Sequence, residues 1–332
     1  MVCKEISKKM ILTKIKNKIR IIKNKKIKPD RIKIKSEYTN LKHLETSDLY
    51  FNNEFALKYL KDNLHAEILN NKEKKTIYHC YWYGLITEKQ IFSIKSALLT
   101  QKNAEIWLWI DTDTWKVNIN NPFINLLKGK ITVKEYNPKE EISDTQFNKL
   151  KRNFLIRDDL ALRSDAFRML VLSKYKGLYF DLDILFLRDF TPLFNNKGFL
   201  YQWEQESYGN SAILYLKDEQ LINNLSQNCI KKNTFIPWIA FYYGTPEIKD
   251  LTVLPCAFFD PIWNITDEKA YNYPITKFED FFKKTDCNIK SMSDFFPGCY
   301  TYHWHNLWKN KIEEDSLFDI FDKELNEKLE IK

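Results

Sequence analysis

The sequence predicts an α/β fold built on a mostly parallel central sheet, and three observations support this. From residue 76 onward, short β-branched and aromatic segments alternate with amphipathic segments of helical periodicity. Polar residues follow the points where the predicted strands end. Apolar residues make up 44% of the 332 residues and aromatic residues 15%, which is ample for a packed core. The length exceeds the roughly 250–300 residues of one core, so we expect one large domain with appendages, or two small domains.

The net charge of +8 belongs to an N-terminal tail. Residues 1–35 hold 14 Lys and Arg against two acids, whereas the rest of the chain holds 38 against 42. Isoleucines recur at helical spacing among the lysines, so the tail is suited to an anionic membrane surface, and a solvated tail is an equal alternative. The mildly acidic body argues against nucleic-acid binding. Residues 36–75 are expected to form a helical extension.

Three segments in the first half of the body are predicted strands because they are rich in β-branched and aromatic residues. They are Thr76–Tyr83, Glu105–Ile110 and Ile131–Tyr136. Between the first two, Thr87–Gln101 carries apolar residues at helical spacing and is predicted to be a helix. Because ligands of parallel sheets bind beyond the carboxyl ends of strands, we expect chemistry near the residues that follow these strands, such as Asp111–Asp113.

The central segment is predicted to form a helix followed by a strand. Asp159–Lys176 has an amphipathic pattern, and Gly177 is placed to end the helix. Leu178–Leu187 then reads as a strand. Further along, the pattern is less regular but indicates strands at Phe199–Trp203, Ser211–Leu216 and Thr252–Leu254 and helices at Asp218–Lys231 and Ile312–Leu329.

Asp181 and Asp183 interrupt the apolar strand predicted over Leu178–Leu187. Residues i and i+2 of a strand point to the same face, so both carboxylates are expected to reach one Mg²⁺ or Mn²⁺ ion. The alternative is a pair of solvated acids neutralised by Arg188 or a nearby lysine. Haloacid-type phosphatases also place Asp-x-Asp at a strand end, but they have Gly and then Thr or Val just afterwards, where this chain reads Ile184-Leu185-Phe186.

The surrounding residues resemble glycosyltransferase family 32, which includes α-1,4-galactosyltransferases and fungal α-1,6-mannosyltransferases and is related to the clostridial glucosylating toxins. The family string is Ser-Asp, an Arg three residues beyond the Asp, a helix that ends in Gly, and Tyr-x-Asp-x-Asp. This chain matches it with Ser164-Asp165, Arg168, Gly177 and Tyr179-Phe180-Asp181-Leu182-Asp183. The chain departs from the family at Lys176, where a second Gly is common.

The resemblance continues in the family's order, from about Thr76 to Lys309. Ile77–Gly84 is similar to the first-strand signature, with His79 and Trp82 matching. Later elements resemble the family at Asn210-Ser211-Ala212, at Pro255-x-x-Phe-Phe-x-Pro261 and at His303-Trp304-His305-Asn306. The tail and residues 36–75 are not covered. The resemblance therefore implies a GT-A-type, Rossmann-like nucleotide-sugar-binding domain at residues 76–310, followed by a C-terminal helix at 311–332.

The resemblance also implies roles for individual residues. Trp82, next to Tyr81, would stack on the uracil, and Asp113 would contact the nucleoside. Ser164, Asp165 and Arg168 would hold the donor sugar and the diphosphate, and Asn210 would face the donor sugar or the acceptor. The expected metal ligands are Asp181 and Asp183 with His303 or His305, a choice that the sequence leaves open, and Trp304 and Trp308 would cover that site. If these residues instead have only structural roles, Trp82 would be a core side chain, Asp165 and Arg168 would form an ion pair along a helix, and the histidines would be packed side chains.

These assignments predict a metal-dependent, retaining glycosyltransferase. It would move a hexose or N-acetylhexosamine from a UDP-sugar, with Mn²⁺ or Mg²⁺, to a glycan, glycolipid, glycoprotein or other hydroxyl acceptor. One alternative is a metal-dependent phosphatase or nuclease that uses Asp181 and Asp183 with further acids from Asp111 or Asp113. The others are a nucleic-acid-binding protein that uses the basic tail, and a relative without catalytic activity that serves as a scaffold.

Six scattered cysteines form no CxxC pair, so the usual zinc spacings are excluded. The sequence shows no secretory apolar segment and no run approaching the roughly 18 apolar residues of a membrane span. We therefore expect reduced, buried thiols and a cytoplasmic protein, peripheral at the inner membrane face if the tail binds lipid.

Overall fold

The computed structural model describes residues 46–63, 75–150, 159–204, 206–263, 265, 269 and 271–331. The predictions for the basic tail, residues 1–35, lie outside this part of the chain. The predicted helical extension is described over residues 46–63, where it forms α2 (Thr46–Phe51) and α3 (Asn53–Asp62). These helices pack on the α/β body, and the hydroxyl of Tyr50 donates a 2.7 Å hydrogen bond to the carbonyl oxygen of Val253.

The central sheet has seven strands in the order β3-β2-β1-β4-β7-β6-β8. Their bounds are Thr132–Tyr136 (β3), Ala104–Asp111 (β2), Thr76–Trp82 (β1), Gly177–Phe180 (β4), Gly209–Leu216 (β7), Gly198–Gln202 (β6) and Thr252–Leu254 (β8). β3, β2, β1 and β4 are parallel to one another, and β8 is parallel to β6. Only β7, among the seven, runs antiparallel to its neighbours. The predicted α/β fold with a mostly parallel sheet is confirmed.

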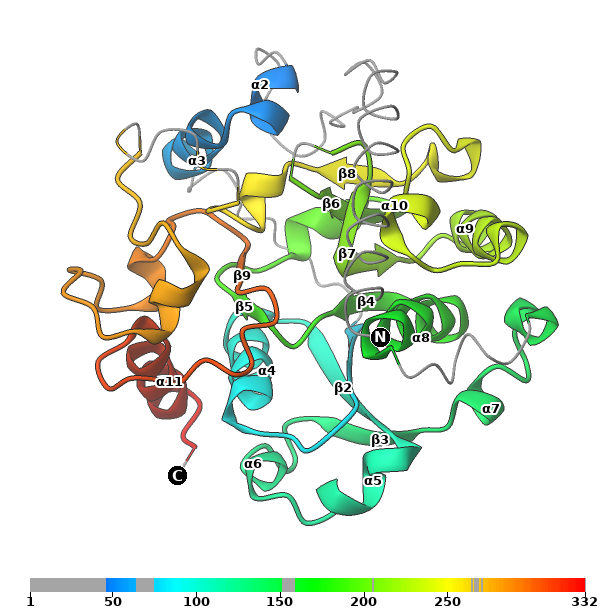
Figure 1. Cartoon of the computed structure of the whole chain (residues 1–332), viewed down its shortest axis with the longest axis horizontal. Coiled ribbons are helices and arrows are strands. Elements are labelled where there is room, and N and C mark those ends of the chain that lie inside the picture. Colours follow the sequence, from blue (N-terminus) through cyan, green and yellow to red (C-terminus); the bar gives the residue numbers. More distant parts are fainter. Residues whose placement is uncertain are drawn as a thin grey trace, which may run out of the picture.

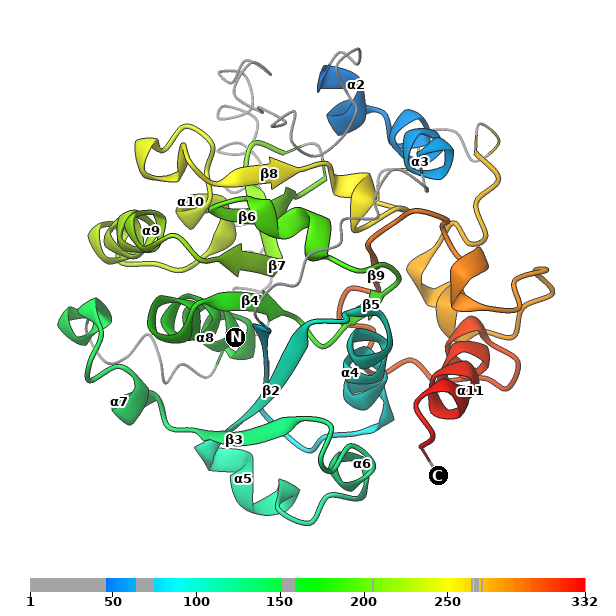
Figure 2. The same cartoon turned by 180° about the vertical axis from the view of Figure 1, so that it is seen from behind.

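Helices cover both faces of this sheet (Figures 1 and 2). One face carries α4 (Glu88–Thr100) and α11 (Leu317–Lys328), and the other carries α8 (Leu160–Tyr175) and α9 (Glu219–Lys232). The alternation of side chains along β1 creates two separate cores. Tyr78 and Cys80 point into the core beneath α4, whereas Tyr81 points into the core beneath α8.

Local sequence explains where the two helices nearest the site begin. Thr87 precedes α4, and its backbone N–H donates to the Gln90 side chain at 2.7 Å in a capping box. Asp159 precedes α8, and its carboxylate accepts from the backbone N–H groups of Ala161 and Leu162. Both helices were predicted to within one residue at each end.

The predicted strand Leu178–Leu187 is wrong, because the chain forms two strands there. β4 ends at Phe180, and β5 (Ile184–Phe186) pairs antiparallel with β9 (Thr301–His303) in a separate two-stranded sheet. The backbone N–H of Asp181 still donates to Ala212 at 2.8 Å, after which the chain turns away from the central sheet. Asp181 and Asp183 therefore lie in a turn between two strands rather than on one face of a single strand.

Lys176, immediately before β4, and Gly177, the first residue of β4, explain the departure from the family at Lys176. Lys176 has φ of 58° and Gly177 has φ of 103°, so both residues adopt backbone conformations that favour glycine. A Cβ atom on Gly177 would lie 2.3 Å from the carbonyl oxygen of Ile77 on β1. Gly177 is thus needed where β4 approaches β1, whereas the side chain of Lys176 is exposed and can be accommodated.

Further short elements connect these parts. They are the helices α5 (Thr112–Asn118), α6 (Pro122–Asn125), α7 (Pro138–Glu141) and α10 (Pro237–Ala240), and the 3₁₀ turns Gln146–Lys149, Thr191–Asn195, Pro246–Ile248, Cys256–Phe258, Phe278–Phe282 and Met292–Asp294. The last helix, α11, begins five residues later than predicted, because Ser316 caps it by accepting from the N–H of Asp319.

The expectation of reduced cysteines agrees with the described part of the chain. Cys80, Cys229, Cys256 and Cys299 are free and buried, and Cys287 is free and half-buried. Within the described residues, every helix is too short or too polar to cross a bilayer.

Candidate active site

A pocket of about 620 Å³ opens at the carboxyl ends of β1 and β4. This is the edge of the sheet where the sequence analysis places the chemistry. Of the predicted site residues, the pocket is lined by Tyr81, Trp82, Ser164, Asp165, Arg168, Asp181, Asp183, Asn210, His303, His305 and Trp308. The fold therefore brings together residues from β1, α8, the turn after β4, β7, β9 and the segment after β9.

Asp183 is held deep in this pocket by the segment that follows β9. Its Oδ2 lies 3.2 Å from Nε2 of His303 and accepts a 2.8 Å hydrogen bond from the backbone N–H of Asn306. Burial raises the pKa of Asp183, but His303 and the Asn306 N–H outweigh burial and lower the pKa to about 2. Burial lowers the pKa of His303, and the charge of Asp183 reverses this and raises the pKa to about 9. Both groups are therefore charged at neutral pH.

Arg168 organises the other aspartates. Its Nη2 lies 3.3 Å from Asp181 and 3.2 Å from Asp165, and its Nη1 donates to the Ser211 hydroxyl at 2.8 Å. Nη2 also lies 3.0 Å from the Ser164 hydroxyl oxygen. Only 5% of Arg168 is exposed, so the pocket has a fixed cation in its wall. The predicted helix ion pair between Asp165 and Arg168 exists, but it is one contact of a buried network.

Asp165 and Asp181 both contact the Arg168 guanidinium, which affects the pKa of each carboxylate. Burial raises the pKa of Asp165 to about 7, although Arg168 opposes the rise. Burial also raises the pKa of Asp181, with Arg168 opposing the rise and Asp183 adding to it. The Tyr179 hydroxyl donates to Asp181. The positive charges of Arg168 and His303 thus face the three carboxylates of Asp165, Asp181 and Asp183, and a divalent cation would offset the remaining negative charge.

Asp260 is a member of the site that the sequence analysis missed. It is 1% exposed, and its Oδ2 lies 2.6 Å from Nε2 of His305 and 3.9 Å from Nδ1 of His303. One ligand atom from each of the three lies within 4.8 Å of the others. Its second oxygen, Oδ1, is buried without a hydrogen bond to any described residue. A buried carboxylate oxygen of this kind, beside imidazole nitrogens, fits a hard divalent cation.

The two histidines have different neighbours, although their rings stack with centroids 3.9 Å apart. His303 touches Asp183 and, through Nδ1, the hydroxyl of Tyr201 at 3.0 Å. His305 touches only Asp260 among the acids described, and burial lowers the pKa of His305. Of the two, His303 is therefore the one in contact with the Asp-x-Asp motif.

An aromatic wall stands at the end of β1. The rings of Trp82 and Trp308 meet at an angle, with centroids 4.8 Å apart. The Trp82 indole N–H donates to the carbonyl oxygen of Leu85 at 3.1 Å, which fixes the orientation of the ring. Beside it, the Tyr81 hydroxyl donates to Asp111 at 2.6 Å. Trp82 is half-buried and lines the pocket.

Two predicted site residues lie elsewhere. Asp113 does not line the pocket, and its half-exposed carboxylate pairs with Arg163 at 3.3 Å. Trp304 is fully buried in the core against Phe92 and Phe281, because it follows β9 with its side chain on the opposite face from His303. It contributes only its backbone N–H, which donates to the carbonyl oxygen of Asp183 at 3.1 Å.

Three further aromatic residues line the side of the pocket formed by β6, β7 and α10. Trp203 and Tyr208 lie at the β6–β7 connection with ring centroids 6.1 Å apart, and Trp238 is 47% exposed. The sequence analysis did not single them out, because an isolated Trp in an irregular segment has no distinguishing pattern.

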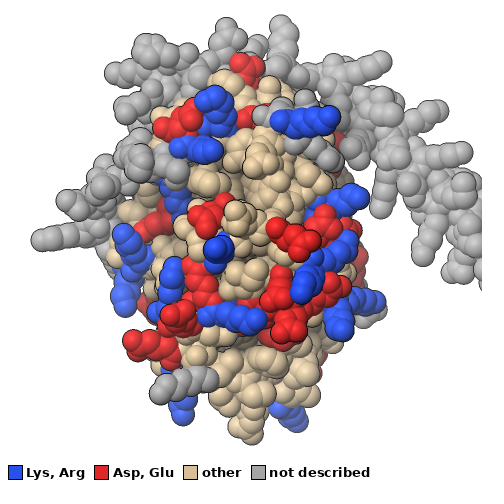
Figure 3. All heavy atoms as spheres, turned by 90° about the vertical axis from the view of Figure 1, so that its left-hand side faces the viewer, with Lys and Arg blue, Asp and Glu red and all other residues tan. Residues whose placement is uncertain are grey.

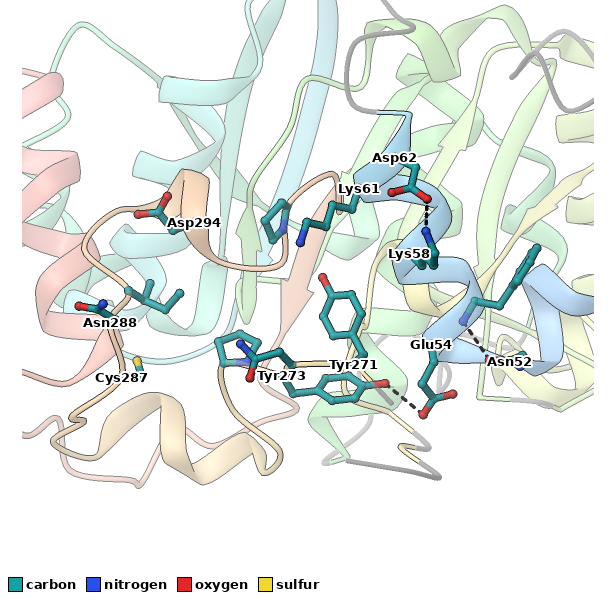
Figure 4. Close-up of a pocket in the computed structure, with 15 residues that line it drawn as sticks. Asn52, Glu54, Lys58, Lys61, Asp62, Tyr271, Tyr273, Cys287, Asn288 and Asp294 are labelled. Carbon is teal, nitrogen blue, oxygen red and sulfur yellow. Dashed lines mark hydrogen bonds and ion pairs between the residues drawn. The ribbon is translucent and has the colours of Figure 1, made fainter. Parts of the chain in front are cut away.

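A second pocket lies between α3 and the segment 271–297 (Figure 4). Lys61, Tyr271 and Tyr273 point into it, and the Tyr273 hydroxyl donates to Glu54 at 3.3 Å. No predicted site residue lines it. Its charged side chains are mixed in sign, with Lys58 already paired to Asp62.

Comparisons with known proteins bear on the first pocket. Residues 87–200 match the family described as "Glycosyltransferase sugar-binding region containing DXD motif". No curated protein matches the chain.

Several solved glycosyltransferases are similar in structure. The PaToxG glycosyltransferase is 16% identical, with 59% of this chain and 77% of that chain covered and a TM-score of 0.42. An active-site mutant of LgtC is 12% identical, with 76% and 95% covered and a TM-score of 0.40. GlyE from Streptococcus pneumoniae is 15% identical, with 56% and 46% covered and a TM-score of 0.36. TM-scores below 0.5 add nothing to the family match.

The matched residues include α4, β2, α8, the Asp-x-Asp turn and β5, which build much of the pocket. The seven-stranded, mostly parallel sheet agrees with the α/β fold that the sequence predicts. The family match covers residues 87–200, about a third of the chain, and with Asp181-Leu182-Asp183 in the pocket it indicates a glycosyltransferase with the DXD sugar-binding region.

Proposed function

We propose that this glycosyltransferase moves a hexose or N-acetylhexosamine from a UDP-sugar to a hydroxyl acceptor, with retention of configuration at the anomeric carbon. The observation that supports this most is the pair Asp181 and Asp183 in one pocket with the buried cation of Arg168. A pocket with two carboxylates, a fixed guanidinium and an aromatic wall suits a metal-bound diphosphate that carries a base.

Asp183, His303 and Asp181 would hold Mn²⁺ or Mg²⁺, with His303 giving up its proton when the ion binds, and Asp260 and His305 would support or complete that set. The ion would offset the charge that develops on the diphosphate leaving group. The Tyr201 hydroxyl, 3.0 Å from Nδ1 of His303, would fix the ring of His303, and Asp260 would fix the ring of His305. The unpaired Oδ1 of Asp260 and the excess of carboxylates support this assignment.

The remaining residues of the pocket would bind and orient the donor. Trp82 would stack on uracil, a contact worth roughly 1–3 kcal/mol for a base on an aromatic ring. Arg168 would face the diphosphate. Asp165 would accept hydrogen bonds from sugar hydroxyls, and the Ser164 hydroxyl would donate to them. Asn210 lines the pocket from β7, but its side-chain oxygen already accepts from the N–H of Ala212 at 2.9 Å, so its amide N–H groups are available to the substrate.

In the proposed transfer, the bond from the anomeric carbon to the diphosphate oxygen breaks, and a bond to the acceptor oxygen forms on the same face of the sugar. The bonding electrons leave with UDP, which also takes up the acceptor proton. We favour a short-lived ion pair over a covalent intermediate, because Asp165, Asp181 and Asp183 are all engaged by Arg168 or His303. Trp203, Tyr208 and Trp238 would line the acceptor side, where aromatic rings suit the apolar face of a glycan.

The test is a screen of nucleotide sugars with the full chain and Mn²⁺, with water as acceptor and release of the free nucleotide as the readout. One UDP-sugar is expected to be hydrolysed well above the others, and chelation is expected to stop the reaction. Release from no nucleotide sugar, together with hydrolysis of a phosphate ester or of DNA, would overturn the proposal in favour of the phosphatase or nuclease. Asp111 and Asp113, which that alternative would use, do not line the pocket.

A further inference from the structure

We propose that a basic, apolar surface beside the active-site pocket docks on an anionic lipid bilayer. This surface, called the α5–α6 surface, consists of Leu85, Val117, Ile119 and Leu126 with the lysines at 116, 128 and 130. It belongs to the folded body and is separate from the basic tail. The inference does not depend on the proposed function.

Exposed aliphatic side chains are concentrated here. Leu85 is 57% exposed, Val117 61%, Ile119 55% and Leu126 37%. They are four of the seven large apolar side chains exposed among the described residues. Scattered exposed apolar residues are normal, but several together on one face mark an interaction surface.

Hydrogen bonds hold the segments of three of these residues, Leu85, Val117 and Ile119, together. The buried amide of Asn118 accepts from the N–H of Ile86 at 3.0 Å and donates to the carbonyl oxygen of Gly84 at 2.8 Å. Asn121 donates to the carbonyl oxygen of Ile86 at 2.9 Å. Leu85, which stands between Gly84 and Ile86, is thereby fixed next to Val117 and Ile119. The surface is a rigid part of the fold, and its shape does not depend on a partner.

The charge of the surface has one sign. Residues 114–134 contain four lysines and no Asp or Glu. Lys116, Lys128 and Lys130 are exposed, and Lys134 lies over the ring of Trp107 at 4.1 Å. Of the acids that flank this stretch, Asp113 is paired with Arg163, and Glu135, at the far end of the stretch from Lys116, accepts a hydrogen bond from the Thr112 hydroxyl. The combination of exposed aliphatic side chains and unopposed lysines matches the headgroup region of an anionic membrane.

The position of the surface supports a membrane as the occupant. α5 and α6 lie at one end of the molecule, beyond the edge strand β3, where they protrude from the body (Figure 1). The same lower end in Figure 3 shows mainly uncharged surface with Lys or Arg at its margins. Leu85 adjoins the pocket, because its carbonyl oxygen accepts from the indole N–H of Trp82. A bilayer on this surface would therefore lie beside the pocket mouth.

The test measures co-sedimentation of the full chain with vesicles of phosphatidylcholine alone and of phosphatidylcholine with phosphatidylglycerol. V117S/I119S removes apolar contact, and K128E/K130E reverses charge. The control K139E/K290E makes the same charge change at two exposed lysines outside the surface. The tail is unchanged in every protein, so its contribution cancels.

We expect each α5–α6 variant to lower the partition onto anionic vesicles by at least about tenfold relative to the control, with unchanged thermal midpoints. Equal partition of both variants and the control would overturn the proposal. So would a chain that is dimeric in solution and that V117S/I119S makes monomeric without loss of vesicle binding, because the surface would then join two copies. If V117S/I119S fails to fold, K128E/K130E decides the matter alone.

Discussion

The Asp183 carboxylate lies 3.2 Å from Nε2 of His303, although the two residues come from distant parts of the chain. The pairing of β5 with β9 brings them together, because Ile184 is the register partner of His303. A two-stranded sheet outside the main one therefore sets the geometry of the candidate metal site. It holds Asp183 on one strand end and His303 on the other, with Asn306 and Asp260 completing the surroundings.

Replacing Trp82 should weaken donor binding. W82A is expected to raise the KM for the UDP-sugar by about 5- to 150-fold, which corresponds to the roughly 1–3 kcal/mol of a stacked base. The KM of W82F should lie between those of the unaltered chain and of W82A, because the smaller phenyl ring can still stack on the base. Steady-state hydrolysis of the donor measures both. An unchanged KM in W82A would remove Trp82 from the nucleotide site.

Replacing Trp238 should affect the acceptor and spare the donor. A sugar ring that covers roughly 50 Å² of the indole contributes about 1.3 kcal/mol at about 25 cal/mol per Å², so W238A should raise the acceptor KM about tenfold. Donor hydrolysis by W238A should stay at the level of the unaltered chain. If W238A lowers the rates of sugar transfer and of donor hydrolysis to the same extent, Trp238 belongs to the donor site instead. W82A and W238A thus serve as controls for each other.

Gly177 should be irreplaceable for stability. G177A combines φ of 103° with a Cβ atom 2.3 Å from the Ile77 carbonyl oxygen, so β4 would have to move away from β1. We expect a loss of more than about 3 kcal/mol in the free energy of unfolding. The matched control is G129A, which has φ of 81° and nothing within 4 Å, and which should lose about 1–2 kcal/mol. Equal losses in urea titrations of the two variants would contradict this.

His79 should make the fold sensitive to mild acid. Burial lowers the pKa of His79 to about 4, while its neutral ring bonds to the Lys176 carbonyl oxygen and the Trp109 indole N–H. The unfolded chain takes up a proton below about pH 6.5 and the folded chain only near pH 4. His79 therefore stabilises the fold above pH 6.5, and this contribution is lost as the pH falls from 6.5 to 4, by about 3 kcal/mol in total.

The matched variant for this prediction is H79Q, which keeps a donor and an acceptor without the titration. The difference in unfolding free energy between the unaltered chain and H79Q should shrink by about 3 kcal/mol between pH 7 and pH 4. Other titrating groups are common to both proteins and cancel. A difference that stays constant across this range would show that His79 does not titrate as described.

Much of the fold could be predicted because strand and helix signals agree with the tertiary structure. Thr87 and Asp159 cap the two helices that apolar spacing indicates in the sequence, and β1, β2 and β3 carry the β-branched and aromatic residues of buried strands. The break after Phe180 could not be predicted, since Leu182, Ile184 and Phe186 are as apolar as a continuous strand. What divides the segment is its long-range pairing, first with β7 and then with β9.

The candidate site was predictable where a local motif carries it. Asp181, Asp183, Ser164, Asp165 and Arg168 stand within a short stretch, and the structure gathers them in one pocket. Asp260 was not predictable, because a lone Asp before a Pro reads as a turn residue. Trp304 was assigned to the pocket wrongly, since alternation along β9 turns it into the core while His303 and His305 face the pocket.

The central claim is that Asp183 helps a divalent cation to bind the diphosphate of a sugar nucleotide. The most direct measurement is Mn²⁺-dependent release of UDP from the preferred UDP-sugar by the unaltered chain, by D183N and by D144N, a control at a carboxylate whose side chain is 78% exposed. The account predicts a loss of at least about 100-fold in D183N, as for a group that stabilises developing charge, and full activity in D144N. Undiminished UDP release by a folded D183N protein would contradict it.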